Sequence, residues 1–152
     1  MRGPFRRGRD GTYKVVLGNT EREILATLPD QLRGVLADPG DAALVRLFPS
    51  AITDDPVGDA EFTMRTQGDL TDDRLASIDT LEETVRADKL TEDQLLAWLR
   101  TLNDLRLVLG VRLDITEDTD FSVAADDPRL PGYELYQFLT WLVDAAVGAL
   151  PV

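Results

Sequence analysis

The chain has 152 residues, of which 43% are hydrophobic and 29% charged, and its formal net charge is −12 at pH 7. That length suits one well-cored domain, and no apolar run approaches the roughly 18 residues of a membrane span. Cysteine and histidine are both absent, which excludes disulfides, thiolate or Ser-His-Asp catalysis and ordinary zinc sites. We therefore expect a non-enzymatic protein, and a cytoplasmic one because no apolar signal core follows the basic N-terminus.

Positive charge is concentrated at the N-terminus. Five of the 16 basic residues lie within the first 14 positions, where one acid accompanies them, so this arm carries +4 and the remaining chain −16. Arg6, Arg7 and Arg9 surround a predicted turn, and we expect them to project together and contact DNA, as basic arms in a minor groove do. The alternative is that they pair with the protein's own acidic surface. No predicted helix has a basic face, which argues against reading of the major groove.

Turn and capping signals predict the first elements. Residues 4–18 combine strand-forming side chains with a central Asp-Gly turn and predict a β-hairpin. Thr20 and Glu23 have the spacing of a helix-capping box. The helix that follows is expected to kink or break at Pro29, and a further short helix is expected over 41–48.

Two separate helices are predicted in the middle of the chain. Asp55 precedes Pro56, which matches an N-cap followed by proline at the first helical position. This helix is expected to run to Gly68. The second is expected over 72–87, where two aspartates in the first turn suit the helix dipole.

The segment 91–116 predicts one long helix, opened by a second capping box between Thr91 and Gln94. Its apolar residues form a helical stripe and also cover most of the remaining circumference; they are Leu95, Leu96, Trp98, Leu99, Leu102, Leu105, Leu107, Val108, Leu109, Val111 and Leu113. A helix that is apolar nearly all round is buried nearly all round. We therefore expect it to be the central helix of the fold or of a subunit interface.

An acidic loop is predicted over 117–130, with Phe121 and Val123 as its anchors, and a final amphipathic helix is predicted over 131–150. The loop lacks the glycine and the closing glutamate of a calcium-binding EF-hand, so we interpret it as solvated surface without a metal. The other carboxylate pairs are explained as caps and first-turn charges of helices. No catalytic residue is assigned.

Asn103, Arg106 and Gly110 form a polar and small stripe on the long helix. An unpaired charge in a buried position is costly, so this stripe needs partners. One interpretation is a polar seam that fixes the register of a dimer, as a buried asparagine does in coiled coils. The other is intramolecular: Arg106 clamps a loop carboxylate, Asp54 or Asp55.

Three segments carry a family resemblance: LFPSAITDDPVGDAEF (47–62), WLRTLNDLRLVLGVRLDIT (98–116) and YELYQFLTWLVDAAVGAL (133–150). Together they resemble an actinobacterial family that was long catalogued as a domain of unknown function and is now named as the oxidative-stress transcriptional regulator AosR. The resemblance covers almost the whole chain. It implies an intracellular, mainly helical, dimeric regulator without enzymatic activity. The family's redox response is tied to cysteines, and this chain has none, so a thiol switch is excluded here.

The combined prediction is a mainly α fold: a single helical domain over 1–152 around a long buried central helix, with a small N-terminal β-hairpin. Residues 1–18 form the basic arm and hairpin, and residues 19–152 the helical body. We expect a homodimeric regulator without a metal, cofactor or membrane contact, which touches DNA through its arm and binds a basic protein partner through its acidic body. The first alternative is an adaptor or scaffold that binds protein only. The second is a carboxylate- or metal-dependent enzyme.

Overall fold

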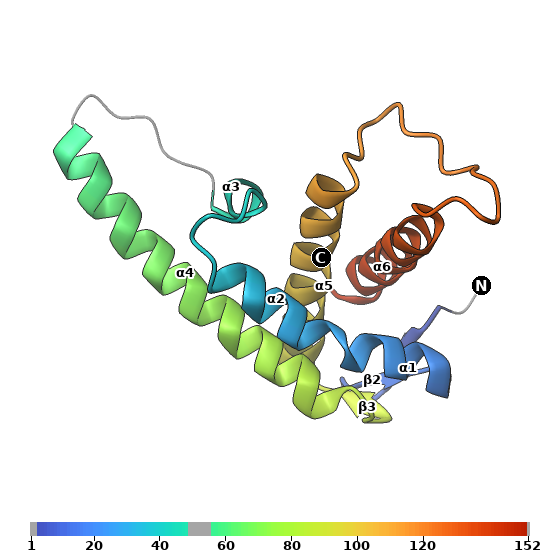
Figure 1. The fold of residues 1–152 in the computed structure, drawn as a ribbon. Coiled ribbons are helices and arrows are strands. Elements are labelled where there is room, and N and C mark those ends of the chain that lie inside the picture. The colour runs from blue at the N-terminus through green and yellow to red at the C-terminus, as the bar shows by residue number, and fades with distance from the viewer. Residues whose placement is uncertain (1–2, 49–55, 152) are drawn as a thin grey trace.

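The computed structural model describes residues 3–48 and 56–151, and for residues 56–67 and 69 it describes the backbone only. In chain order the elements are β1 (Phe5–Arg7), β2 (Tyr13–Val15), α1 (Asn19–Ala26), α2 (Leu28–Leu36), α3 (Leu44–Leu47), α4 (Pro56–Thr84), β3 (Lys89–Leu90), α5 (Glu92–Arg112) and α6 (Leu130–Ala149). Figure 1 shows long helices with a small sheet at one end. The prediction of a mainly α fold is confirmed.

The sheet contains the predicted hairpin and one further strand. β1 pairs with β2 in an antiparallel register that sets Phe5 opposite Val15, and Gly11 takes a left-handed conformation (φ +80°) in the turn. β3 then pairs antiparallel with the other edge of β2, with Leu90 opposite Tyr13. The sequence did not indicate β3, because a strand of two residues has no alternating pattern to recognise.

At α1 the predicted capping box was wrong, whereas the predicted break at Pro29 is confirmed. The N-cap of α1 is Gly18, whose backbone N–H donates to Glu21 Oε1 at 2.8 Å, so the helix begins before the predicted box at Thr20 and Glu23. Glycine has no side chain to complete the box, but the acidic residue still satisfies one free backbone donor. α1 ends before Pro29, which lies in the first turn of α2, as the prediction of a break requires.

α4 is one continuous helix of 29 residues, so the prediction of two helices separated near Gly68 was wrong. No proline lies between 57 and 84, and a single glycine costs a helix only about 1 kcal/mol. The predicted N-cap, Asp55, lies outside the described residues. In Figure 1 the first half of α4 extends beyond the other helices, while its second half lies along α2.

α5 is the predicted central helix, and it contacts α2, α3, α4, α6 and β3. Its capping box is confirmed: the Gln94 N–H donates to Thr91 Oγ1 at 3.1 Å, and the Thr91 N–H donates to Gln94 Oε1 at 2.9 Å. One face is buried in the core, by Leu95, Ala97, Trp98, Thr101, Leu102, Asp104, Leu105 and Val108. The opposite face is only half-buried, at Leu96, Leu99, Asn103, Arg106, Leu107 and Gly110, so burial is less complete than the sequence pattern predicted.

Trp98 joins the sheet to the helices. It is fully buried, its Nε1–H donates to Thr84 Oγ1 at 2.7 Å, and its ring meets Phe5 edge-on at 5.9 Å between centroids. An indole buried with its N–H satisfied supplies a large apolar contact without an orphaned donor. The position of the basic hairpin is therefore fixed against α4 and α5.

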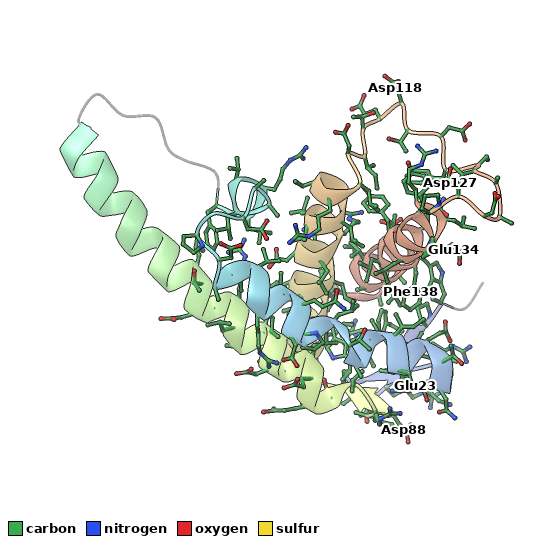
Figure 2. The ribbon with its side chains drawn as sticks, viewed as in Figure 1. Glu23, Asp88, Asp118, Asp127, Glu134 and Phe138 are labelled. Atoms are coloured by element: carbon green, nitrogen blue, oxygen red, sulfur yellow. The ribbon has the colours of Figure 1, made fainter. Side chains whose placement is uncertain are left out.

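The loop between α5 and α6 is anchored as predicted at Phe121. Its ring stacks on Tyr136 and meets Tyr133 edge-on, at centroid distances of 5.8 and 5.2 Å. Asp118 and Asp127 belong to this acidic loop (Figure 2). Among the described helices, none is both long enough and apolar enough to cross a membrane.

Candidate functional site

Three cations occupy neighbouring positions on one face of the sheet, where Lys14 and Lys89 are exposed and Arg6 is half-buried. Arg6 in β1 is paired with Lys14 in β2, and Lys14 is paired with Lys89 in β3. Successive strand residues point to opposite faces, so these three lie on the face turned away from the buried side chain of Tyr13. Like charges directly opposite each other on neighbouring strands are destabilising. We call Arg6, Lys14 and Lys89 the basic sheet face.

The three predicted arm residues are not all brought to one face. Arg7 follows Arg6 in β1 and lies on the other side of the sheet, in register with Tyr13. Arg9 is exposed in the turn. Lys89 was missed by the sequence analysis, because it joins the other cations through a strand pairing between positions 75 residues apart.

The cations of the hairpin are little neutralised by the chain itself. Lys89 Nζ lies 3.7 Å from Asp10 Oδ2, and among the described residues Arg6, Arg7 and Arg9 make no ion pair. Hydrogen bonds donated by the side chain and the backbone N–H of Thr12 lower the pKa of Asp10, so its carboxylate is ionised at neutral pH. Asp10 therefore offsets one positive charge of the basic arm. Glu23 and Asp88 bring acidic side chains to the same end of the molecule (Figure 2).

Asn103 and Arg106 of the predicted polar seam contact each other within α5. Arg106 Nη2 donates to Asn103 Oδ1 at 2.8 Å, one helical turn away, and both side chains are half-buried. Gly110 continues the stripe toward α6, where a Cβ would be 3.9 Å from Tyr136 Cε2. The predicted clamp from Arg106 to Asp54 or Asp55 lies outside the described residues.

A buried ion pair beside this seam was missed by the sequence analysis. Arg74 Nε lies 3.0 Å from Asp104 Oδ2, and Asp104 is 7% exposed. Arg74 Nη2 also donates to the Leu47 carbonyl at 2.9 Å, and its guanidinium lies 4.7 Å from the centroid of the Phe48 ring. Burial raises the pKa of Asp104, and attraction to Arg74 offsets part of that rise. The available signal was that Asp104 falls on the apolar face of the central helix.

The ion pair and Asn103 line a cavity of about 370 Å³ between α4 and α5. It is lined by Leu70, Asp73, Arg74, Arg100, Asn103 and Asp104. Such a mixture of charges is typical of a polar cleft and differs from the mostly apolar walls of a small-molecule site. The chain has no histidine or cysteine, and the described lining residues include no serine, threonine or lysine to act as a nucleophile.

The acidic loop offers no metal centre among the described residues, where no group of three potential ligands converges. Arg129 Nη2 lies 2.8 Å from Asp127 Oδ2. Hydrogen bonds from the side chain and backbone of Arg129 lower the pKa of Asp127 to about 2. One carboxylate of the loop is thus already paired with a cation of its own chain.

The chain matches the family described as "Domain of unknown function (DUF2017)" over residues 1–150. A Mycobacterium leprae (strain TN) protein is 41% identical over 73 residues, which are 48% of this chain and 34% of that protein. Proteins named "Oxidative stress regulator AosR" in Mycobacterium bovis (strain ATCC BAA-935 / AF2122/97) and Mycobacterium tuberculosis (strain ATCC 25618 / H37Rv) are 30% identical over 129 residues. Those residues are 74% of this chain but only 59% of each relative. No solved structure gives a significant match.

Proposed function

Because this chain belongs to the DUF2017 family, we propose that it is a non-catalytic regulator of the response to oxidative stress that contacts DNA. The contact is made by the basic sheet face together with Arg7 and Arg9. The names of the mycobacterial relatives support the regulatory role. The absence of cysteine means that in this chain the oxidative signal is not read by a thiol.

The observation that carries the DNA contact is the row of cations formed by Arg6, Lys14 and Lys89. Three like charges on adjacent strands repel each other in the isolated protein, and a phosphate backbone removes that repulsion. The contact is made to phosphates and groove shape, because no helix face that the structure describes is basic enough to read base edges. The acidic body opposes non-specific binding, so only this end of the molecule approaches DNA.

Fluorescence anisotropy of a labelled duplex, titrated across salt concentrations, tests the proposal. The double variant Lys14→Gln/Lys89→Gln is expected to weaken binding and to reduce the slope of log K against log salt by about 0.9 for each phosphate that is no longer neutralised. The matched control is Arg46→Gln/Arg100→Gln, which removes two exposed arginines from α3 and α5. Equal weakening in both variants, or an unchanged slope in the first, would contradict binding through the sheet.

An adaptor that binds only protein is the second candidate, and the exposed acids of α4 favour it. Asp72, Asp73, Asp79, Glu82 and Glu83 are all exposed along its second half. In this alternative function, the acidic surface of α4 binds a basic protein partner, and the basic N-terminal arm makes no contact with that partner. A folded protein that fails to bind duplex DNA at low salt would favour the adaptor over the DNA-contacting regulator.

The proposed regulator acts as a homodimer, and we place the contact on the half-buried face of α5. Leu96, Leu99 and Leu107 lie on this face with Asn103 between them. Leu70, at 37% exposed, extends the apolar surface onto α4. A polar residue within an apolar interface selects one register of association.

A further inference from the structure

Three helices leave a cavity where they meet. It has a volume of about 300 Å³ and lies between α2, α5 and α6. Its lining residues are Leu28, Gln31, Val35, Leu105, Val108, Leu109, Arg112, Leu135 and Leu139. All except two are aliphatic, and this combination of apolar walls with very few polar groups is the usual composition of a small-molecule site.

The size of the cavity limits its ligand. An engineered apolar cavity of about 150 Å³ binds benzene, so a space of about 300 Å³ accepts a body of roughly a dozen non-hydrogen atoms. The walls include Leu28, Val35 and Leu139, which are at most 6% exposed. The body of the ligand is therefore hydrocarbon.

The two polar groups of the lining define the other end of the ligand. Gln31 Nε2 donates to the Thr27 carbonyl at 3.2 Å. Arg112 is half exposed, and its Nη2 donates to Asp41 Oδ2 at 2.7 Å. Among the described residues no other acceptor reaches the Arg112 guanidinium, so most of its five donors remain available. A guanidinium with free donors binds a carboxylate in a bidentate manner.

Asp41 holds Arg112 in place at this position. Its side chain is 8% exposed and accepts a 2.9 Å hydrogen bond from the Ala43 N–H. The hydrogen bonds from Ala43 and Arg112 lower the pKa of Asp41, so the carboxylate stays ionised at neutral pH. A ligand carboxylate therefore approaches a guanidinium that is already oriented, but it competes with Asp41 for the same cation.

We propose that this cavity binds a small monocarboxylate with an apolar body, such as a medium-chain fatty acid, whose carboxylate pairs with Arg112. Such a ligand contacts α2, α5 and α6 together. With the proposed regulatory function, its binding would carry a metabolic signal to a chain that has no cysteine. The site lies outside the basic sheet face, so ligand binding and DNA binding are measured separately.

Calorimetric titration with octanoate and with 1-octanol tests the proposal, because the two probes share a chain and differ in charge. The unchanged protein is expected to bind octanoate about tenfold more tightly than 1-octanol, the advantage of a hydrogen-bonded charge. In Arg112→Gln that preference is expected to vanish while 1-octanol binding is retained. In Asp41→Asn, which breaks the same ion pair but keeps the cation, octanoate binding is expected to tighten severalfold.

A variant that fills the cavity completes the test. Leu109→Trp places a larger side chain on a lining position of α5 and is expected to abolish binding of both probes, with folding checked by its thermal transition. Equal affinities for octanoate and 1-octanol in the unchanged protein would overturn the proposal. An equal weakening of octanoate binding in Arg112→Gln and Asp41→Asn would also overturn it, because it would assign the effect to the ion pair and not to the cation.

Discussion

Arg22 in α1 donates a 2.9 Å hydrogen bond from its guanidinium to the carbonyl oxygen of Val85, 63 residues further along the chain. The same guanidinium donates to the carbonyls of Ala87 at 2.9 Å, Val15 at 3.2 Å and Leu17 at 3.3 Å. Arg22 is 7% exposed and makes no ion pair among the described residues. Its charge is instead balanced by backbone dipoles, including the carbonyl end of α4. One side chain thus joins α1, the hairpin and α4.

Arg22→Met is expected to lower the free energy of unfolding by about 3 kcal/mol, because it leaves several buried carbonyls without donors. Arg22→Lys should recover part of that stability, since an ammonium group has three donors for four carbonyls. Urea denaturation measures both changes. The control is Arg86→Met, at an exposed position two residues after the end of α4. A cost below about 1 kcal/mol for Arg22→Met would mean that water replaces the missing donors.

The Arg74–Asp104 pair should behave differently from Arg22, whose partners are neutral carbonyls. Here two charged side chains both lose hydration in the folded state. Arg74→Met and Asp104→Leu are each expected to cost about 3 kcal/mol, since each leaves one buried charge unpaired. The double variant should return close to the unchanged protein, because it removes both desolvated charges together. A double-mutant cycle from urea denaturation measures this coupling. Additive costs would show that the two charges do not depend on each other.

The raised pKa of Asp104 predicts a pH dependence. Burial is the main cause and lifts the pKa of this carboxyl above its ordinary value of 3.8. The folded state then holds the proton more tightly than the unfolded state. The contribution of Asp104 to stability is therefore greatest below pH 3.8 and is lost as the pH rises through the folded pKa.

Asp104→Asn removes that titration. We expect the thermal midpoint of the unchanged protein, relative to that of the variant, to fall as the pH rises from about 3.5 to 7. Calorimetric scans of both proteins at matched ionic strength measure the difference. A difference in thermal midpoint that stays constant across this range would contradict a raised pKa of Asp104. A difference that increases with pH would mean that the pKa of Asp104 is lowered in the folded state.

The end of α5 provides a backbone test. Asp114 has a positive φ of 53°, and the Ile115 N–H donates to the Gly110 carbonyl at 2.8 Å while the Asp114 N–H donates to the Val111 carbonyl at 3.2 Å. This pattern is a Schellman cap, where glycine is the usual residue at the left-handed position. Asp114→Gly is expected to be about 1 kcal/mol more stable than Asp114→Ala in urea denaturation. Equal stabilities would show that the cap opens in solution.

Some local signals predicted local structure correctly, although those for the capping box at Thr20 and the break near Gly68 did not. The capping box of Thr91 and the break at Pro29 were correct because each depends on residues within one helical turn. The site was less predictable, since its partners meet through tertiary pairing. Lys89 reaches Lys14 only when β3 joins the sheet, and Arg22 finds its acceptors only when α4 ends beside the hairpin. No periodicity in a single sequence encodes such distant pairings.

Gly110 and Asn103 lie on one stripe of α5, and substitutions at the two positions are expected to have different effects. A Cβ at Gly110 would meet its nearest neighbour, Tyr136, at 3.9 Å, which is an ordinary van der Waals distance. Gly110→Ala is therefore expected to raise the free energy of unfolding by about 0.5 to 1 kcal/mol, through helix propensity alone. Urea denaturation measures the gain. A decrease in stability would require a helix packed more closely on Gly110 than α6 is.

Light scattering during gel filtration tests the dimer contact at Asn103. Asn103→Leu removes the acceptor of the Arg106 hydrogen bond from the half-buried face of α5. Since a polar residue of this kind selects the register of an interface, the substitution is expected to change the mass of the assembly. Arg46→Gln, at an exposed position of α3, serves as the control, and its mass should stay unchanged. An unchanged mass for Asn103→Leu would assign Asn103 and Arg106 to the monomer and move the dimer contact elsewhere.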